Sequence, residues 1–370
     1  MSLIKVKSRG TDGVAGGGRR NLLINGGMQV AQRGEARTSS DNSWEGYATV
    51  DRWSFRWNNS VSGAATISHE NSGDRPAGFG DFFKVNMATA NTSLSSSDWV
   101  YLYQPIEAQN LQKLKYGTSS AEKLTLSFYA KRVGTWAGSQ NISVGLQTVD
   151  GTPEYINASV TTQTTWTRHS VTFAGSTSAT IDNNNGAGLN VFISLAGSQS
   201  GSYTGAASTS WSTTRQDFDN QIGNLLSNTA NEFHITGLQL EIGDSATDFE
   251  HRTFAEELSL CQRYFYKVQG SNSDRPGIGG YVVGASEARM DVVFPCAMRA
   301  APTIGGTGTA QFDGHADSAD FNCSAIIIDE VPTGIVSSLG IQIATSGMTN
   351  GHSGGLRFRS DSTLSFSAEL

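Results

Sequence analysis

The sequence predicts an all-β protein with an N-terminal arm, a β-sandwich, a short connecting helix and a second, C-terminal β-sandwich. Short runs in which apolar and polar residues alternate recur along most of the 370 residues, as expected of half-buried strands. Turn residues separate these runs, and the chain contains 42 glycines. A single helical pattern interrupts them, at residues 251–267.

The first 20 residues form the predicted arm, which is basic and rich in glycine. Residues 1–37 contain seven Lys and Arg against two Asp and Glu, and this excess suits docking onto an acidic partner. Because a glycine-rich terminus orders only when something holds it, we expect another chain to bind this arm. The alternative is a solvated, flexible tail. The candidate anchoring residues are Lys5, Lys7, Arg9, Arg19 and Arg20.

Residues 21–250 contain the first predicted sandwich. Two short apolar runs in residues 21–34 predict a pair of strands joined by a turn at Gly26 and Gly27. Further strands are predicted at 51–57, 99–107, 123–132, 141–149, 169–175, 189–197 and 232–243. In the last of these, the apolar phase changes at Gly237, which predicts a β-bulge. Antiparallel pairing is expected, because no helices separate these strands.

The helix is predicted within residues 251–267, as a connector between the two sandwiches. Thr253 and Glu256 have the spacing of a capping box, in which each side chain accepts a backbone N–H of the other residue. Apolar residues then recur at helical spacing and predict a stripe that packs against one sandwich. This stripe consists of Phe254, Leu258, Cys261 and Phe265. Residues 268–370 alternate again and predict the C-terminal β-sandwich.

Composition disfavours several classes of protein. The net charge of −7 is unlike the basic surface of a nucleic-acid-binding protein. No run approaches the roughly 20 apolar residues that cross a bilayer, and we expect no membrane insertion. The first residues lack the apolar core of a signal peptide, so export by that route is not expected. The three cysteines have no CxxC spacing and indicate reduced, packed thiols.

No familiar catalytic motif is present, and we expect a protein that is not an enzyme. The chain contains no HExxH helix, phosphate-binding loop or GxSxG turn, and no two of its six histidines have metal-ligand spacing. A glycosidase needs two carboxylates roughly 5–10 Å apart, and acidic residues are numerous enough to leave that alternative open.

Two kinds of ligand site are candidates. Asp182 in DNNNG, with Asp217 and Asp219 in QDFDN, offers the oxygen ligands that calcium prefers, although DNNNG is first of all a turn sequence. No other cofactor is expected. Glycan binding needs exposed aromatic rings near polar groups, and aromatic residues in polar loops are Trp136, Tyr203 and Trp211. The alternative for each is local or intersubunit packing, which we also expect for the strand residues Trp53, Trp57 and Trp99.

Several motifs resemble a family of bacteriophage virion proteins, described as tail-fibre or minor structural proteins. The most specific is DFEHRTFAEELSLCQRYF at 248–265, and the resemblance extends over most of the chain from residue 18 onward. The other motifs are GRRNLLINGGMQVAQRG, DRW, YLYQPIEAQN, LTLSFYAKR and FPCAMRAAPTI.

The resemblance implies a jelly-roll domain similar to carbohydrate-binding modules, a helical junction and a C-terminal β-domain, assembled as a homotrimer. It implies a virion protein, a tail fibre or receptor-binding protein, whose partners are other copies of itself, a virion protein held by residues 1–20 and a host surface glycan. The alternatives are a capsid-decorating or head-fibre protein, and a carbohydrate-active enzyme or its glycan-binding module.

Overall fold

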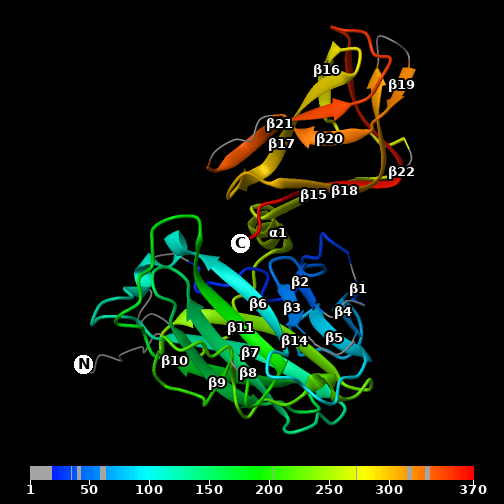
Figure 1. Ribbon diagram of the computed structural model, residues 1–370. Helices are drawn as coiled ribbons and strands as arrows, with labels where there is room; N and C mark the ends of the chain where they lie inside the picture. Colours follow the sequence, from blue (N-terminus) through cyan, green and yellow to red (C-terminus); the bar gives the residue numbers. More distant parts are fainter. Residues whose placement is uncertain are drawn as a thin grey trace, which may run out of the picture. The chain divides into compact units, whose positions relative to one another are not determined.

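The computed structural model describes residues 19–34, 36–39, 43–58, 64–201, 203–271, 273–314, 319–329 and 334–370. The chain divides into two compact units, Met1–Phe254 and Ala255–Leu370. The described residues form 22 strands, one α-helix and three short 3-10 helices, so the predicted all-β fold is confirmed (Figure 1). Among them, no helix has the length and apolar character needed to span a membrane.

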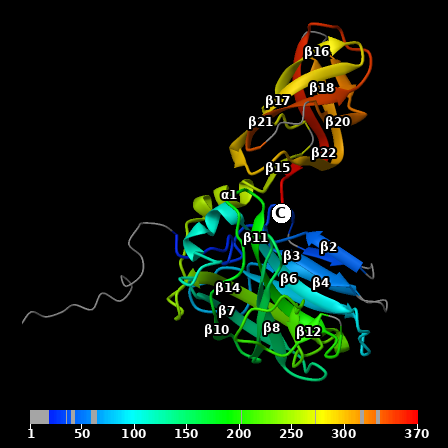
Figure 2. The ribbon, with the colours of Figure 1, turned by 60° about the vertical axis from the view of Figure 1, so that its left-hand side comes forward.

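The N-terminal unit contains two six-stranded sheets that enclose one apolar core (Figures 1 and 2). The first sheet contains, in spatial order, β1 (Ala36–Ser39), β4 (Ala64–Glu70), β5 (Phe82–Thr89), β14 (Glu232–Ile242), β7 (Leu124–Val133) and β10 (Thr167–Phe173). The second contains β2 (Ser43–Tyr47), β3 (Ser54–Asn58), β6 (Trp99–Glu107), β11 (Ala187–Gly197), β8 (Asn141–Thr148) and β9 (Tyr155–Thr161). All pairs within both sheets are antiparallel.

Shorter elements complete this unit. The three 3-10 helices are η1 (Ala108–Asn110), η2 (Gln112–Leu114) and η3 (Leu225–Ser227), and β12 (Thr204–Gly205) pairs in parallel with β13 (Phe218–Asp219).

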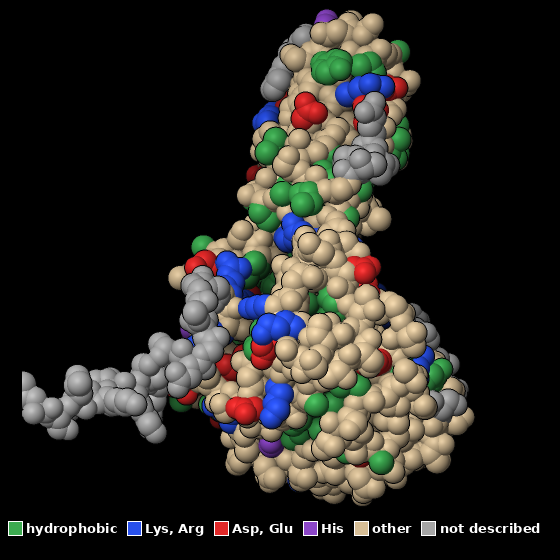
Figure 3. Space-filling view, turned by 90° about the vertical axis from the view of Figure 1, so that its left-hand side faces the viewer, with side chains coloured by type: hydrophobic (Ala, Val, Ile, Leu, Met, Phe, Trp, Pro, Cys, Tyr) green, Lys and Arg blue, Asp and Glu red, His purple; other side chains and the backbone are tan. Residues whose placement is uncertain are grey.

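Most of the face seen in Figure 3 consists of backbone and uncharged side chains, with charged groups scattered among them. This agrees with the 16% of charged residues in the chain.

The two-residue period places aliphatic and aromatic side chains between the sheets, as predicted. Leu126 and Phe128 of β7 are fully buried, and so are Val191 and Ile193 of β11 on the facing sheet. Burying one such side chain contributes about 1.5–3 kcal/mol relative to leaving it in water. The predicted bulge is also confirmed, because the register between β14 and β7 shifts at Gly237, whose φ is 65°.

The segment 21–34 differs from its prediction, because it contains no strand. It lies beside the second half of β14, where the pairing of β14 with β5 has ended at Ile235. Leu22 N donates to Leu240 O (2.9 Å), and Leu238 N donates to Gly26 O (3.0 Å). Side chains replace the missing strand ladder: the Asn21 amide donates to Leu238 O and accepts from Leu240 N, each at 3.0 Å. The segment therefore continues the sheet without regular strand geometry.

The residues after β14 hold this segment in place through the carboxylate of Glu250. Its two oxygens accept the backbone N–H groups of Arg20 and Asn21, each at 3.0 Å. Arg252 donates to Glu250 Oε2 (3.2 Å) and to Asn21 O (2.6 Å). Burial alone would raise the pKa of Glu250, but these two N–H groups and the Arg252 guanidinium outweigh it and lower the pKa below its ordinary value. We call this arrangement the Glu250 clasp.

The C-terminal unit contains one eight-stranded sheet that curves around its own core. In spatial order the strands are β19 (Ala319–Asn322), β18 (Thr303–Gly314), β22 (Ser353–Ser367), β16 (Gly279–Gly284), β17 (Glu287–Met298), β21 (Val336–Ala344) and β20 (Ala325–Ile328), with β15 (Phe265–Gly270) also paired to β22. The chain between β19 and β20 bonds to both sides of the sheet: Cys323 N donates to Ala310 O (3.0 Å), and Ser324 N donates to Ala344 O (2.8 Å). The two layers of this unit are thus formed by one sheet.

The helix α1 (Phe254–Gln262) begins directly after Thr253, as the capping spacing predicts, but the predicted stripe is only partly correct. Cys261 is buried and Leu258 is half-buried, whereas Phe254 is 56% exposed. Phe265 is buried in β15 and lies outside the helix, because the helix ends at Gln262. The boundary between the two units falls within α1, between Phe254 and Ala255.

We predict that Glu250→Gln destabilises the N-terminal unit by about 1–3 kcal/mol at neutral pH, because a buried N–H group and Arg252 lose an acceptor. Since the pKa of Glu250 is lowered, the wild-type contribution is present above its ordinary pKa near 4.5 and is lost as pH falls through the folded pKa. The variant should therefore show a weaker loss of stability in acid, measured by urea unfolding at several pH values. Glu122→Gln, which removes a solvent-exposed pair with Lys115, is the control and should cost under about 1 kcal/mol. Equal effects of both substitutions would contradict the clasp.

Candidate functional site: the outer aromatic face of the second sheet

The second sheet carries a group of aromatic side chains on the surface that faces away from the main core. Val100 and Leu102 of β6 point into the core, whereas Trp99, Tyr101 and Tyr103 lie on the opposite side. All nine residues of β6 are buried, so both of its faces are covered. The outer group comprises Trp99, Tyr101, Tyr103, Phe192, Phe218 and Ile222, with Tyr203 at its margin, and we call it the aromatic face.

The rings of the aromatic face contact one another in defined geometry. Trp99 and Tyr101 are stacked, with centroids 4.7 Å apart and an interplanar angle of 18°. Phe192 meets Tyr101 edge-on at 5.2 Å and lies 5.3 Å from Tyr103. The guanidinium of Arg56 lies over the Tyr103 ring at 4.4 Å. Such contacts contribute about 0.5–1.5 kcal/mol per pair beyond area burial and fix the ring orientations.

Amide side chains continue this surface across β11, β8 and β9. The strand register places Tyr103, Phe192, Gly145 and Asn157 in one line across four strands. Gly145 has no side chain, and an added Cβ there would lie 3.0 Å from Ile156 O and 3.2 Å from Asn157 Cβ, so Asn157 and its strand occupy that position. The line therefore changes from aromatic to polar within one sheet.

The next line across the sheet is polar. It contains Asn190, Gln147 and Tyr155. Asn190 Nδ2 donates to Gln147 Oε1 and Gln147 Nε2 donates to the Tyr155 hydroxyl, each at 3.0 Å. These bonds orient the two amide side chains. The Asn190 carbonyl oxygen has no hydrogen-bond partner among the described residues.

Several buried polar atoms here have no hydrogen-bond partner among the described residues. They are Asn157 Oδ1, Ser159 Oγ, Asn190 Oδ1 and Gln216 Oε1. Asn157 is 1% exposed and Asn190 is 5% exposed. An unsatisfied buried polar group costs about 1–3 kcal/mol, so each of these atoms needs a partner, either an ordered water or a ligand.

The segment 216–219 lies across the edge of this face. Ser194 Oγ donates to Asp217 O (3.1 Å), Asp219 N donates to Ser143 Oγ (2.9 Å) and Asn157 Nδ2 donates to Gln216 O (3.3 Å). These bonds join the segment to β11, β8 and β9 in turn. They fix it as a third layer over part of the sheet.

Arg215 links this segment to the aromatic face. Its guanidinium lies over the Tyr203 ring at 4.1 Å and donates to both oxygens of Asp217, at 2.6–3.1 Å. Burial raises the pKa of Asp217 above its ordinary value, although the Arg215 guanidinium opposes that shift. The charged form of the buried Asp217 carboxylate is thus stabilised by one cation, Arg215.

Of the three predicted glycan-binding residues, only Tyr203 lies at this site. Trp136 is 2% exposed and packs against Phe233 in the main core, so its prediction was wrong. Trp211 packs edge-on against Tyr116 and donates its Nε1 to Ala174 O (2.7 Å) at the edge of that core. Loop sequences alone do not show that these two indoles turn inward.

The predicted calcium ligands have separate partners. Asp217 is bound by Arg215, Asp219 Oδ1 accepts from Gln221 N, and the exposed Asp182 contacts Asn184. No group of three or more His, Cys, Asp or Glu able to hold a metal ion occurs in the part of the chain that the structure describes. Within DNNNG, Gly186 N donates to Asn184 Oδ1 (2.7 Å).

The predicted anchoring residues are placed only in part. Lys5, Lys7 and Arg9 lie outside the described residues. Arg19 is exposed. Arg20 differs from its prediction, because its side chain donates to Thr247 Oγ1 (3.0 Å) and its backbone joins the Glu250 clasp.

The sequence contains a signal for the aromatic face that lies outside the polar loops. In residues 99–103, aromatic and aliphatic residues alternate, so both sides of the strand are apolar but differ in kind. A strand with one aliphatic side and one aromatic side indicates two different surroundings. The polar half of the site could not be found in this way, because Asn157, Asn190 and Gln216 come from three distant segments.

Comparisons with known proteins give only distant similarities. No protein-family model matches the sequence, and no curated protein is similar to it in sequence. Among solved structures, the chain is similar to the enzymatically active domain of tailspike protein 4 of bacteriophage CBA120, with 9% identity and a TM-score of 0.30 over 60% of this chain. The match spans about a fifth (21%) of the tailspike chain.

Two further similarities involve carbohydrate-binding modules. One is the family 11 module of Clostridium thermocellum in complex with a β-1,3-1,4-mixed-linked tetrasaccharide, with 12% identity, a TM-score of 0.28, and 59% of this chain and 98% of that chain covered. The other is a tandem of family 22 modules from Paenibacillus barcinonensis, with 9% identity, a TM-score of 0.29, and 96% and 98% covered. These low values bear on neither the site nor the function of this chain.

We predict that Arg215→Gln destabilises the N-terminal unit by about 1–3 kcal/mol at neutral pH, because it leaves the buried Asp217 carboxylate without its cation. The pKa of Asp217, already raised, should rise further. For an acid whose folded pKa is raised, folding favours the protonated form, so the loss should grow as pH increases and shrink as pH falls toward the ordinary carboxylate pKa. Thermal unfolding between pH 4 and 8 measures this loss of stability. Adding Asp217→Asn should restore much of the stability, and a double variant no better than Arg215→Gln would contradict this account.

Proposed function

We propose that this protein is a glycan-binding protein of a bacteriophage particle, a tail fibre or receptor-binding protein that attaches the particle to its host through the aromatic face. The glycan-binding part rests on one observation. Stacked aromatic rings and four buried polar atoms without hydrogen-bond partners among the described residues lie together at the second sheet. Sugar rings have an apolar side that packs on aromatic rings and hydroxyl groups that donate to amide oxygens. Both kinds of group lie together at the second sheet, where Trp99, Tyr101 and Tyr103 are at most 8% exposed.

The bacteriophage part of the proposal rests on the resemblance of the sequence motifs to virion proteins, with the motif at 248–265 as its most specific element. Residues of that motif build the Glu250 clasp, so the motif supports a shared architecture for the N-terminal unit. Location on the particle and assembly as a homotrimer belong to the same proposal.

We propose binding without turnover. Glycoside hydrolysis uses two carboxylates that flank the scissile bond. Two carboxylates lie on the segment 216–219 beside the aromatic face: Asp217 has both oxygens bound by Arg215, and Asp219 Oδ1 accepts from Gln221 N. Multiple copies on one particle would make weak contacts sufficient, because linked sites raise the effective concentration.

The test is binding of the purified protein to an array of bacterial surface polysaccharides, followed by affinity measurements on the best ligand. Asn157→Ala and Asn190→Ala should each weaken binding by about 3–10-fold, the equivalent of one hydrogen bond. Asn71→Ala, an exposed residue in the turn after β4, is the matched control and should bind as the wild type does.

Unchanged affinity in both folded variants would refute the site. Release of reducing ends from the bound polysaccharide would refute the proposal of binding without turnover. Melting curves of all three variants exclude unfolding as the cause of any loss.

A further inference from the structure

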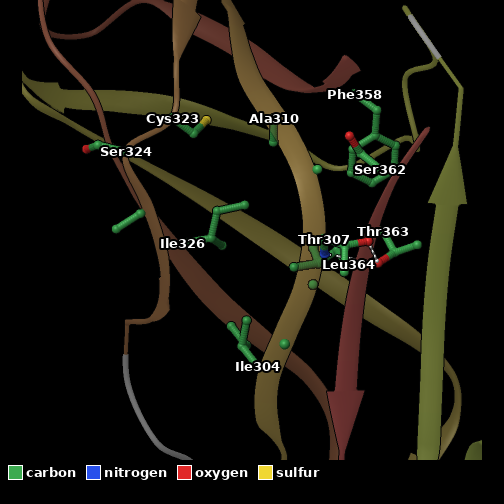
Figure 4. Close-up of a pocket in the computed structure, with 14 residues that line it drawn as sticks. Ile304, Thr307, Ala310, Cys323, Ser324, Ile326, Phe358, Ser362, Thr363 and Leu364 are labelled. Atoms are coloured by element: carbon green, nitrogen blue, oxygen red, sulfur yellow. Dashed lines mark hydrogen bonds between the residues drawn. The ribbon is translucent and has the colours of Figure 1, made fainter. Parts of the chain in front are cut away.

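The C-terminal unit contains an open pocket of about 320 Å³ between β18, β22 and β20 (Figure 4). This volume is at the lower end of the roughly 300–1,000 Å³ that is typical of ligand sites. Every lining residue belongs to this one unit. Figure 4 shows Ile326 and Cys323 on one side of the pocket, and Thr307 and Thr363 on the other. The pocket therefore suits a small ligand rather than a long chain.

The lining combines aliphatic side chains with hydroxyl groups and contains no charged side chain. Ile304 and Ile326 are among its aliphatic residues. The hydroxyls of Thr307 and Thr363 lie 3.0 Å apart, and each retains capacity for a further hydrogen bond. None of the 14 lining residues is Asp, Glu, Lys, Arg or His, and burial raises the pKa of the Cys323 thiol to about 12, so this thiol is neutral. A charged ligand would lose hydration here without meeting an opposite charge.

β18 presents unpaired backbone groups to the pocket. In an antiparallel ladder, successive residues direct their N–H and C=O groups to opposite sides. Ala368 N donates to Tyr264 O (2.8 Å) on the β15 side of β22, so residues 363, 365 and 367 are the ones that bond to β18. Ile304 and Gly306 lie between the partners of these residues and direct their own groups away from β22. These groups have no hydrogen-bond partner among the described residues.

β20 presents the same kind of groups from the other side. Asp329 N donates to Gly340 O of β21 (3.0 Å), and the register of the two strands continues from that pair. Alternation then directs the N–H and C=O groups of Ile326 away from β21. Ile326 lines the pocket, and these groups also have no hydrogen-bond partner in the part of the chain that the structure describes. Donors and acceptors of two strand edges thus border the pocket.

Glycines and one backbone bond set the shape of the pocket. Gly308 has a φ of 82°, a conformation that favours glycine, at a register shift between β18 and β22. Gly305 and Gly306 also lack side chains, so the edge of β18 is accessible from the pocket. At one end, Cys323 N donates to Ala310 O (3.0 Å) and joins the two sides. An extended peptide that followed both edges would meet this bond, so the pocket favours a short ligand.

The chemistry of the lining favours a neutral ligand that carries a secondary amide. An entirely apolar ligand would leave the N–H and C=O groups of both edges unpaired. A secondary amide offers one donor and one acceptor, the same pair of groups that a strand edge bonds. An acetamido group adds a methyl that the aliphatic side chains can cover, and neighbouring hydroxyls can bond to the threonines. A neutral N-acetylated sugar carries all of these groups.

We propose that this pocket binds a neutral N-acetylated sugar residue. Its acetamido group bonds to the backbone of Gly306 and Ile326, its methyl packs against Ile304, and its hydroxyls face Thr307 and Thr363. This inference goes beyond the proposed function, because the pocket lies in a different unit from the aromatic face and uses different residues. The result at one site therefore does not decide the result at the other.

Titration of the full-length protein with N-acetylglucosamine, followed by NMR of the isoleucine methyl groups, tests the proposal. The methyl signals of Ile304 and Ile326 should shift and saturate, while that of the 51% exposed Ile327 should not. D-Glucose has a hydroxyl in place of the acetamido group and should bind about 3–10-fold more weakly, the equivalent of one hydrogen bond. Unchanged signals of Ile304 and Ile326, or equal affinity for the two sugars, would overturn the proposal.

Two neighbouring variants locate the site by the same titration. Ile326→Trp places a larger side chain in the pocket and should weaken binding of N-acetylglucosamine at least 5-fold. Ile327→Trp changes the next residue, on the opposite side of β20, and should bind as the wild type does. Equal affinity of the two variants would contradict the site. Melting curves show whether both are folded, and if Ile326→Trp is not, the comparison of sugars on the wild-type protein decides the question.

A peptide probe separates a sugar site from a strand-addition site. N-acetyl-trialanine amide carries secondary amides but no hydroxyl groups, and it should bind more weakly than N-acetylglucosamine. Tighter binding of this peptide would overturn the proposal in favour of a polypeptide ligand. Asn157→Ala, a substitution in the other unit, should leave the shifts of Ile304 and Ile326 unchanged, which keeps this result separate from binding at the aromatic face.

Discussion

The fold and the candidate site both depend on one constraint, the burial of β6 on both of its faces. Aliphatic side chains on one face join the core between the two sheets, and aromatic side chains on the other form the aromatic face. A strand of this kind cannot stand at a solvent-exposed sheet surface without exposing three large rings. The three rings are at most 8% exposed. Arg56 lies over Tyr103, and the segment 216–219 brings polar groups to the same side of the sheet. The candidate site is therefore a second buried layer on this sheet, in which several amide oxygens have no hydrogen-bond partner among the described residues.

The Glu250 clasp holds the chain that lies along the second half of β14, where β14 no longer pairs with β5. After the bulge at Gly237, β14 loses its partner β5, and the segment 21–26 takes that place through backbone bonds and the Asn21 amide. The carboxylate of Glu250 then satisfies N–H groups that no regular strand would pair. Glu250 and Arg252 of the motif at 248–265 thus have a structural role in the N-terminal unit.

Most of the fold was predictable from the sequence, because two-residue periodicity directly reports which side of a strand is buried. The phase change at Gly237 even located the bulge correctly. The segment 21–34 was mispredicted because its apolar residues are buried without strand geometry, held by asparagine side chains. The helix stripe was overextended because apolar periodicity continues across the change from α1 to β15 at Phe265. Trp136 was misassigned because a polar neighbourhood in sequence does not determine burial. The polar half of the site depends on cross-strand register, which no local pattern encodes.

The central claim is that the aromatic face is a ligand surface and not only a second core. Amide hydrogen exchange of the wild-type protein, with and without the polysaccharide of its host, tests this most directly. The account predicts slower exchange on binding in β6, β9 and β11, around residues 101–104, 155–159 and 190–194. Protection confined to the C-terminal unit, or to loops away from the second sheet, would contradict it.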